Sequence, residues 1–572
     1  MHSSKKQGLT WLYGFVKPHQ PQIFRLLLLS FFASALVLLQ PYLTKILIDD
    51  GLLGKSFATL VSTVMAILLV GFASTGLAGV NRYLHTRLSG TILFKLRESV
   101  YSHLQRLSPN FYAQQRTGDL LSRMDGDIAE LQRFAVDGLF ASVSGILGLI
   151  GAVTMMFLLS WQLALLLLLL IPLQWLYLRL MRPKVERQTR KMRERSADIS
   201  SFLAETLPSM KQIQSSVAED RELNRLSNLN QFYLKDLLKL QWIEFATSAI
   251  PSSLTSFTRA AAFVMGGYWV IQGQLALGSL IAFVTYLGMA VGPVQTLLGI
   301  YMAWQRFTVS LERVQHLMDY QPDLVASDSH PVPTTLKGDL KFEQVSFSYN
   351  DQATAILEKT TVQIPAGSKV GIYGPSGIGK STLADLIMRH FSPTAGRILV
   401  DNHDIAQFDL RGLRRHVALV AQDIVLFRGT FADNIRYSVP EASDEEVAQA
   451  VARANLGEFI GTLPQGLNSL IGERGSQLSG GQKQRIAVAR ALLQKPVLVI
   501  FDEATSAIDL SNEQQLMAEV DRLFANITRL VISHRETPIL DADLFLTLVN
   551  GQIQLSEPTT HSVRSVKTQH HA

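Results

Sequence analysis

Two short segments in the C-terminal half of the chain carry residues whose types and spacing suit phosphate chemistry. The first runs from Gly374 to Thr382 with the sequence GPSGIGKST. This is the pattern of a phosphate-binding loop, in which glycines let backbone N–H groups turn inward around phosphate oxygens. Lys380 would place its charge on the β- and γ-phosphates of ATP, and the Ser381 hydroxyl would reach Mg²⁺. The loop residues expected to bind the nucleotide are Gly374, Pro375, Ser376, Gly377, Gly379, Lys380, Ser381 and Thr382.

The second segment has the sequence LSGGQ at residues 478–482, and an apolar run ending in Asp502-Glu503 follows it. The run predicts a buried parallel strand over Val497–Phe501. An acid at the end of such a strand can hold the coordination shell of Mg²⁺, which is the role expected of Asp502. Glu503 is then placed to polarise the attacking water as a general base.

The residues around these segments predict an α/β domain. Lys369–Tyr373 has the pattern of a strand that enters the phosphate loop, and Thr382–Phe391 that of a helix that leaves it. Leu530–Ile532 is a further short apolar run suited to a buried parallel strand. Asn550-Gly551, inside the apolar stretch Leu544–Leu555, is a strong hairpin signal. A strand before the loop and a helix after it are the context in which this pattern binds nucleotide.

The composition places a membrane domain before this α/β domain. A chain of 572 residues is too long for one domain. Apolar residues make up 47% and charged residues 17%, and the apolar excess lies before about residue 305. The formal net charge is +6, and many basic residues fall between apolar runs, as in Arg182–Arg195. This is the positive-inside pattern of cytoplasmic loops, so we expect no nucleic-acid partner.

The sequence contains no cysteine. Disulfides, thiolate metal sites and a cysteine nucleophile are therefore excluded.

Six apolar segments have the length of about 20 residues that a bilayer span requires. The spans are expected at residues 24–48, 57–80, 136–159, 162–181, 250–271 and 279–303. The connections at 82–137 and 182–240 are long, charged and helical in pattern, so we expect membrane helices that continue into the cytoplasm and turn back. Because long basic connections stay in the cytoplasm, both termini are expected there too.

The chain is predicted to be multidomain, with an all-α six-helix transmembrane domain followed by an α/β phosphate-loop ATPase domain. Apolar density falls after Arg306, and Pro322, Pro331 and Pro333 appear, which is typical of a linker. The polar tail after Pro558 is expected to be disordered. The predicted boundaries are 1–305 for the transmembrane domain, 306–337 for the linker, 338–557 for the nucleotide-binding domain and 558–572 for the tail.

The region from residue 338 to 555 resembles the nucleotide-binding domain of ATP-binding cassette (ABC) transporters. LSGGQ shortly before the Asp502 strand is highly specific for that family. The resemblance implies that Tyr349 stacks on adenine, that Gln422 contacts Mg²⁺, and that His534 contacts the γ-phosphate during catalysis. Two further segments, Gly472–Gly475 and Ser506–Asp509, resemble the X-loop of exporters and the D-loop.

The resemblance also implies that two such domains pair head to tail, with ATP between the phosphate loop of one and the LSGGQ of the other. Ser479, Gly480, Gly481 and Gln482 would then complete the site of the partner chain. We expect a second copy of this chain as the partner, with a heterodimer as the alternative. Every motif position is intact, so we expect an active ATPase.

The N-terminal half resembles the six-helix membrane domain of ABC exporters. Phe111–Arg123 resembles the first intracellular loop, which docks on the nucleotide-binding domains, and Thr206–Gln214 is expected to form the second coupling helix. Pro208 departs from the family pattern, which more often has glycine there.

The resemblance implies ATP-driven export or flipping of an amphipathic cargo by alternating access. The cargo could be a lipid, a drug, a small peptide or a natural product, since this fold does not specify its substrate. The expected location is the bacterial inner membrane, with membrane lipids around the spans and the nucleotide-binding domain in the cytoplasm. The alternative is a gated channel or a regulatory subunit, but these can tolerate the loss of Glu503 and His534, which are both present.

Arg259 is the one full charge inside the fifth predicted span. It lies about 20 Å from the outer end of that helix, at 1.5 Å per residue, which is within the hydrocarbon slab. A lipid-facing arginine would be costly there. We expect Arg259 either to pair with a polar group on a neighbouring helix or to face a central cavity that takes anionic cargo.

Overall fold

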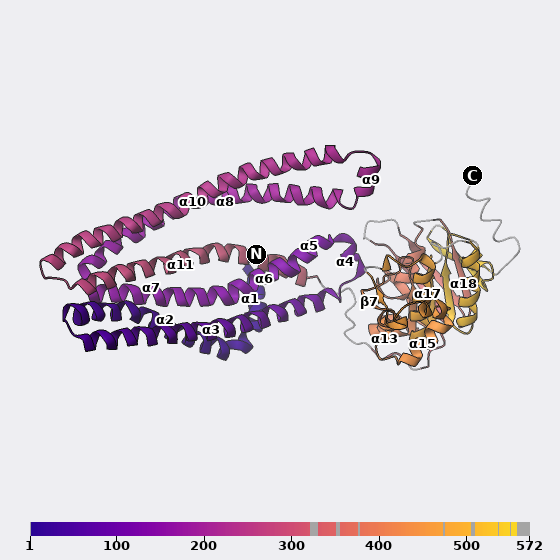
Figure 1. Ribbon diagram of the computed structural model, residues 1–572. Helices are drawn as coiled ribbons and strands as arrows, with labels where there is room; N and C mark the ends of the chain where they lie inside the picture. Colours follow the sequence, from indigo (N-terminus) through magenta and orange to yellow (C-terminus); the bar gives the residue numbers. More distant parts are fainter. Residues whose placement is uncertain are drawn as a thin grey trace. The chain divides into compact units, whose positions relative to one another are not determined.

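The computed structural model describes residues 2–320, 330–333, 335–349, 355–375, 378–472, 475–504, 510–535, 537–549 and 551–556. The chain divides into two compact units. The first comprises Met1–Gln105 and Thr117–Asp319 and is helical, and the second comprises Arg106–Arg116 and Tyr320–Ala572 and contains the sheets (Figure 1). The predicted tail over 558–572 lies outside the described residues.

Long helices pack in antiparallel pairs in the first unit. Helix α2 lies beside α3, α7 beside α11, and α8 beside α10 (Figure 1). The helices of this unit are α1 (His2–Val16), α2 (Gln20–Ile46), α3 (Phe57–Leu104), α5 (Thr117–Ser122), α6 (Ile128–Gln132), α7 (Leu139–Leu159), α8 (Trp161–Thr206), α9 (Met210–Ser215), α10 (Glu219–Ile271) and α11 (Leu277–Met318). Short 3-10 or π-helical segments continue some of these helices: η1 (Lys17–His19) is 3-10, and η2 (Leu47–Leu53), η3 (Arg123–Asp127) and η4 (Arg133–Gly138) are π-helical.

All six predicted spans lie within helices of this unit. In the described residues, four helical stretches are long and apolar enough to cross a membrane: Gln7–Leu53, Phe57–Leu104, Thr117–Leu159 and Leu277–Leu297. They contain or overlap the first, second, third and sixth predicted spans. The predicted spans at 162–181 and 250–271 lie inside α8 and α10. These two helices are not among the four stretches that meet the requirement of length and apolar composition, so both spans stay predictions.

The helices that continue beyond the predicted spans are confirmed. Helix α3 runs on to Leu104, and α8 and α10 form a long pair with the short helix α9 at its end. The predicted linker begins too early, because α11 continues to Met318. Phe307, Leu311 and Val314 follow one another at helical spacing and are buried, so the helix persists where the overall apolar density falls.

The second unit is built on a mostly parallel sheet with the strand order β12-β11-β3-β10-β9-β6. A smaller antiparallel sheet has the order β2-β1-β4-β5, and β7 pairs with β8. The strands are β1 (Leu340–Phe347), β2 (Leu357–Ile364), β3 (Lys369–Tyr373), β4 (Ala395–Val400), β5 (His403–Asp404), β6 (Val417–Val420), β7 (Gly429–Thr430), β8 (Leu470–Ile471), β9 (Leu498–Asp502), β10 (Thr528–Ile532), β11 (Leu544–Val549) and β12 (Gln552–Ser556).

The predicted strands and the hairpin are confirmed. Strand β3 has the predicted bounds, and β10 contains the predicted run Leu530–Ile532. Strand β9 covers the run predicted over Val497–Phe501 from Leu498 on, and it extends one residue further, to Asp502. Strands β11 and β12 pair antiparallel around Gly551, while Asn550 lies outside the described residues. The helices of this unit are α4 (Pro109–Gln114), α12 (Lys380–Ile387), α13 (Leu410–His416), α14 (Phe431–Ile435), α15 (Asp444–Arg453), α16 (Gly457–Gly461), α17 (Gly480–Gln494) and α18 (Leu510–Leu523).

Helix α12 is shorter than the helix predicted over Thr382–Phe391. It starts at Lys380 and ends at Ile387. Arg389 has a left-handed backbone with φ of 49°, and its side chain donates hydrogen bonds to the carbonyls of Ile405 and Phe408. A left-handed residue ends a helix, so these contacts set its limit.

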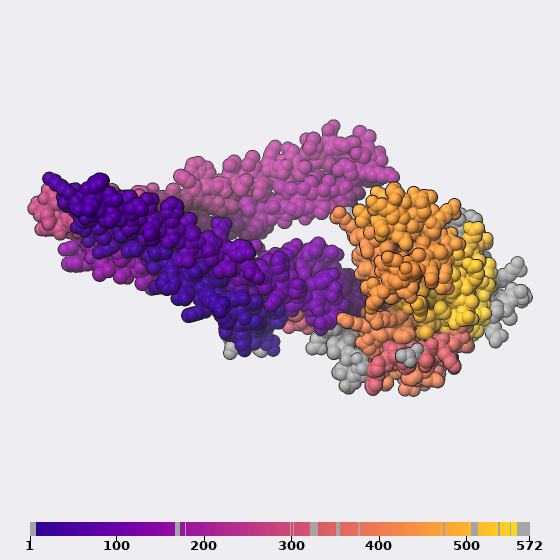
Figure 2. All heavy atoms as spheres, turned by 60° about the horizontal axis from the view of Figure 1, so that its bottom comes forward, coloured from indigo at the N-terminus to yellow at the C-terminus, as the bar shows by residue number. Residues whose placement is uncertain are grey.

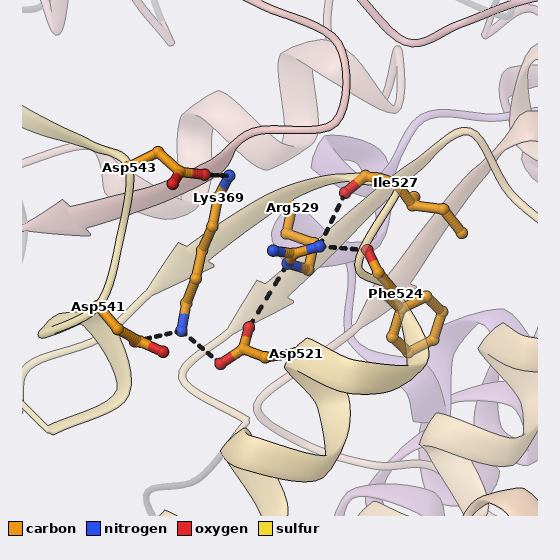
Figure 3. Close-up of polar contacts among 7 residues, drawn as sticks. All are labelled: Lys369, Asp521, Phe524, Ile527, Arg529, Asp541 and Asp543. Carbon is orange, nitrogen blue, oxygen red and sulfur yellow. Dashed lines mark hydrogen bonds and ion pairs between the residues drawn. The ribbon is translucent and has the colours of Figure 1, made fainter.

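A buried cluster of charges ties together the amino ends of β3 and β10 (Figure 3). Lys369 is 2% exposed, and its Nζ donates to Asp521 at 2.6 Å and to Asp541 at 2.5 Å. Arg529 of β10 lies 3.5 Å from the other oxygen of Asp521. Burial raises the pKa of Asp521 against the opposing effect of Lys369. Burial also acts to raise the pKa of Asp541, but Lys369 lowers it overall.

Candidate functional site

The phosphate loop connects β3 to α12, as its sequence predicts. Gly379 immediately precedes α12 and has φ of 104°, in the region that favours glycine. A Cβ at this position would lie 2.2 Å from Cγ2 of Ile356, so no larger residue fits without a shift. Gly374 and Pro375 lie at the start of the loop, whereas Ser376 and Gly377 lie outside the described residues.

Lys380 is the first residue of α12 and is 5% exposed. Its Nζ donates to the carbonyls of Gly374 at 2.7 Å and Pro375 at 3.0 Å. Burial lowers the pKa of Lys380, and the carboxylates of Glu503 and Asp502 oppose that change. The ammonium is therefore held at the mouth of the loop, where a phosphate would meet it.

Ser381 and Asp502 lie together, as predicted for the ligands of a metal ion. The Ser381 hydroxyl donates to Oδ1 of Asp502 at 3.2 Å. Burial raises the pKa of Asp502, the hydrogen bond from Ser381 opposes it, and the neighbouring charge of Glu503 adds to it. A hydroxyl and a carboxylate are hard oxygen ligands, so this pair fits Mg²⁺.

The Glu503 carboxylate lies between Gln422 and His534, two residues to which the family resemblance assigns roles. Nε2 of Gln422 donates to Oε2 of Glu503 at 2.9 Å. Nε2 of His534 lies 2.5 Å from Oε1 of the same carboxylate and 3.3 Å from Nζ of Lys380. The glutamate has a left-handed backbone with φ of 47°, and its N–H donates to the carbonyl of Ile532 at 2.9 Å. The structure thus brings Glu503, Gln422, His534 and Lys380 into one cluster.

The strand order explains this convergence. Strands β3, β10 and β9 are parallel neighbours, so their carboxyl ends lie at one edge of the sheet. Lys380 follows β3, His534 follows β10, and Asp502-Glu503 ends β9. Gln422 follows β6, the next parallel strand. Ligands of open parallel sheets bind at this edge.

Tyr349 and Thr382 contact each other, with the hydroxyl oxygens 3.0 Å apart. The Tyr349 ring packs edge-on against Phe347 and Phe391, with centroids 5.1 Å and 5.2 Å away, and remains 41% exposed. The ring therefore lies near the phosphate loop with an accessible surface. Its stacking on adenine stays a prediction.

The LSGGQ segment forms the start of helix α17. Ser479 is the N-cap, whose hydroxyl accepts a hydrogen bond from the N–H of Gln482 at 3.3 Å, while Oε1 of Gln482 accepts from the N–H of Ser479 at 2.9 Å. The Ser479 O–H and the N–H groups of the first turn, Gly480 and Gly481 among them, remain for a ligand outside the helix. A Cβ built at Gly481 would meet no atom within 4 Å, so packing within this chain does not require glycine there.

Several motif positions lie outside the described residues: Glu473 and Arg474 of the X-loop and Ser506–Asp509 of the D-loop. Sequence reasoning missed Gln484, which is buried beneath the LSGGQ turn and contacts the residue after Glu503. A signal was available. Gln484 occupies the same helix face as Val488 and Ala491, which are apolar and buried, so helical spacing alone places it inside.

The first predicted coupling segment is divided between the units. Residues Arg106–Arg116, which include α4, group with the second unit, while Thr117 onward belongs to the first. Phe111 of α4 is buried, and its ring lies edge-on to Tyr320 at 4.9 Å. Of the second predicted coupling segment, Thr206–Gln214, Thr206 ends α8 and Met210–Gln214 lie in α9. The coupling role of α9 stays a prediction.

Arg259 of α10 is exposed, and its Nη2 lies 3.5 Å from where a Cβ of Gly288 in α11 would stand. Among the described residues Arg259 has no hydrogen bond and no ion pair. The prediction that Arg259 pairs with a polar group on a neighbouring helix requires such a partner. The described part of the chain does not supply one.

Comparison with known proteins shows the family to which the chain belongs. Residues 23–294 match the family described as ABC transporter transmembrane region, and residues 357–506 match the family described as ABC transporter. YgaD of Bacillus subtilis, named as a candidate multidrug export ATP-binding/permease protein, is 32% identical over 545 residues, 94% of each chain. A relative in Staphylococcus aureus with the same descriptive name is 33% identical over 547 residues, again 94% of each chain. This chain belongs to the ABC transporter family.

The fold is that of an ABC exporter. A solved bacterial Atm1-family ABC exporter with ATP bound superimposes with a TM-score of 0.78 and 26% identity, covering 97% of this chain and 96% of that one. The membrane domain and the nucleotide-binding domain are fused in one chain, as the sequence predicts. The cluster around Glu503 therefore lies in a transport ATPase domain.

Proposed function

We propose that this ABC transporter chain is one half of a homodimeric exporter that uses Mg²⁺-ATP to move an amphipathic cargo out of the cytoplasm across the inner membrane. The observation that carries the proposal is the cluster at the carboxyl edge of the sheet, where Lys380, Gln422, Glu503 and His534 meet. Each holds a group that ATP hydrolysis needs: Lys380 a phosphate-binding cation, Gln422 an amide oxygen for Mg²⁺, Glu503 a base and His534 a contact for the γ-phosphate.

The residues divide the chemical work between them. Lys380 and the loop N–H groups bind the β- and γ-phosphates, and Glu503 accepts a proton from the attacking water. His534, beside both Glu503 and Lys380, is within reach of a γ-phosphate placed between them. Mg²⁺ would be held by Ser381, Asp502 and the amide oxygen of Gln422, and when bound it would neutralise charge on the transferred phosphoryl group.

Two observations support pairing with a second copy. The first is Gly481, where the first turn of α17 is open to a ligand from outside the chain. The second is the far end of the α8–α10 pair, which stands clear of the other helices of its own unit (Figure 2). Large apolar side chains are exposed along this part of α10, although the sequence predicts it outside the membrane, and such surfaces are typical of protein interfaces. These side chains are Leu223, Phe232, Leu234, Leu238 and Trp242.

The contacts around Glu503 do not favour the alternative function, a gated channel or a regulatory subunit. A non-hydrolysing relative could lose the base or the histidine, yet here both are present and face each other. ATP turnover by protein in lipid vesicles supports the exporter, whereas nucleotide binding without turnover would support the alternative.

The decisive experiment is Glu503→Gln in purified protein. The amide keeps the shape of the side chain but cannot accept the proton, so ATP hydrolysis should fall by about 10²- to 10⁴-fold while ATP binding persists. Glu441→Gln, an exposed carboxylate of the same unit, is the matched control and should keep the parent rate. Hydrolysis by Glu503→Gln within a few-fold of the parent would refute the assignment of Glu503 as the base.

A further inference from the structure

Gln484 is a buried polar side chain that the proposed chemistry leaves without a role. It lies on α17 at 4% exposure, one turn inside the Ser479 cap. Its Nε2 donates a hydrogen bond to the carbonyl oxygen of Ala504. Its Oε1 is buried and has no hydrogen-bond partner among the described residues. A buried amide that is only half satisfied costs free energy, so its position calls for a reason.

The acceptor of that hydrogen bond is the residue after Glu503. Glu503 itself has a left-handed backbone, which is strained for a residue with a side chain and persists only where the surroundings fix it. Two hydrogen bonds do so from either side. The Glu503 N–H donates to Ile532 at 2.9 Å, and the Ala504 carbonyl accepts from Gln484.

We propose that Gln484 is a positioning residue for Glu503. By holding the Ala504 carbonyl, it fixes the strained turn and so keeps the Glu503 carboxylate between Gln422 and His534. It also links Glu503 to α17, the helix that begins with LSGGQ, so that a displacement of α17 moves the turn at Glu503-Ala504. The inference rests on the proposed function of Glu503 as the general base.

The same helix supplies a matched control. Gln494, near the other end of α17, donates from Nε2 to the carbonyls of Arg414 at 2.6 Å, Arg415 at 3.1 Å and Val417 at 3.1 Å. It therefore shares the residue type, the helix and the kind of acceptor with Gln484, but none of its hydrogen bonds among the described residues goes to Glu503 or Ala504. A purely structural role predicts similar effects for both positions.

The test compares Gln484→Met with Gln494→Met in the full-length transporter in lipid vesicles. Methionine keeps the length of the side chain and removes the donor. Gln484→Met should lower kcat about 10- to 100-fold, the effect of a small misplacement of a catalytic group, and leave the KM for ATP within about two-fold. Gln494→Met should leave kcat of the folded protein unchanged. A kcat for Gln484→Met near the parent value, or equal losses for the two variants, would overturn the proposal.

A double variant separates this inference from the proposed function. If Gln484 acts through Glu503, adding Gln484→Met to Glu503→Gln should not lower the residual single-turnover rate further, because the base is already absent. Multiplicative losses would overturn the positioning role. If Glu503→Gln alone keeps the parent rate, the proposed base is wrong. If it is inactive and Gln484→Met is fully active, only the positioning role is wrong.

Discussion

At the scale of single residues, the fold holds the Lys380 ammonium at the phosphate loop. Its ammonium is buried and donates to two loop carbonyls rather than to a carboxylate. We predict that Lys380→Ala weakens ATP binding about 10- to 100-fold, because charged hydrogen bonds to the phosphates are lost. Titration calorimetry with ATP measures the change. Lys337→Ala, an exposed lysine of the same unit, should bind like the parent, and unchanged affinity in Lys380→Ala would contradict the assignment.

Arg259 is the residue for which the structure narrows a choice left open by the sequence. Because it has no polar partner among the described residues of its own chain, we predict that it meets an anion. Arg259→Ala should abolish the stimulation of ATPase activity by phosphatidylglycerol in vesicles while leaving the basal rate intact, and Arg259→Lys should restore part of it. Arg221→Ala, exposed on the charged part of the same helix, is the control. Full stimulation of Arg259→Ala would reject the role in anion binding.

Single residues also mark the limit of prediction from sequence. The positions of Lys380, Asp502 and Glu503 follow from short motifs, because Lys380 ends the phosphate loop that leaves β3, and Asp502 and Glu503 lie at the end of β9. The contacts of Glu503 with Gln422 and His534 join positions 81 and 31 residues apart, and only the strand order brings them together. Gln484 was missed because a polar side chain between Lys483 and Arg485 suggests an exposed turn, although its helix face is apolar.

At the scale of elements, the Lys369 cluster fixes β3 and β10 at the ends opposite the nucleotide site (Figure 3). We predict that Lys369→Met destabilises the second unit by about 3 kcal/mol, because the partly buried Asp521 loses its 2.6 Å hydrogen bond to Lys369 and keeps only the 3.5 Å contact with Arg529. The thermal midpoint, followed by scanning fluorimetry, should fall by about 5–10 °C. Lys341→Met, which removes the partly exposed pair with Glu343, should barely change it. Equal shifts would show that burial of the cluster has no special weight.

Elements were predictable where one local signal dominates. The parallel strands were placed to within about two residues because short apolar runs between polar turns have few alternatives. The end of α11 was misplaced because a drop in overall apolar content hid a single buried stripe over Phe307–Leu317. The end of α12 could not be seen at all, since the contacts that hold Arg389 come from residues 405 and 408.

At the scale of the whole molecule, a nucleotide site shared between two chains can be distinguished experimentally from a site within one chain. Two inactive chains are co-expressed. One carries Lys380→Ala, and the other carries Gly481→Arg to block the open turn of α17, at a position where an added Cβ meets no atom of its own chain within 4 Å. If ATP lies between two copies, the mixed dimer has one intact site and should retain about one ATP per dimer. Neither homodimer should retain any. Absence of bound ATP in the mixed dimer would contradict head-to-tail pairing.

The length of α10 has a mechanical consequence. A helix of 53 residues is about 80 Å long. Such a rod acts as a lever: a tilt of about 5° at one end sweeps the other through about 7 Å, given the rise of 1.5 Å per residue. A small tilt near the C-terminal end of α10, which need not break side-chain packing there, thus corresponds to a large displacement at α9. If α9 receives the nucleotide-driven movement, as its predicted role as a coupling helix implies, helix length sets the ratio between that movement and the opening of a cargo pathway. Shortening the α8–α10 pair should then change this ratio.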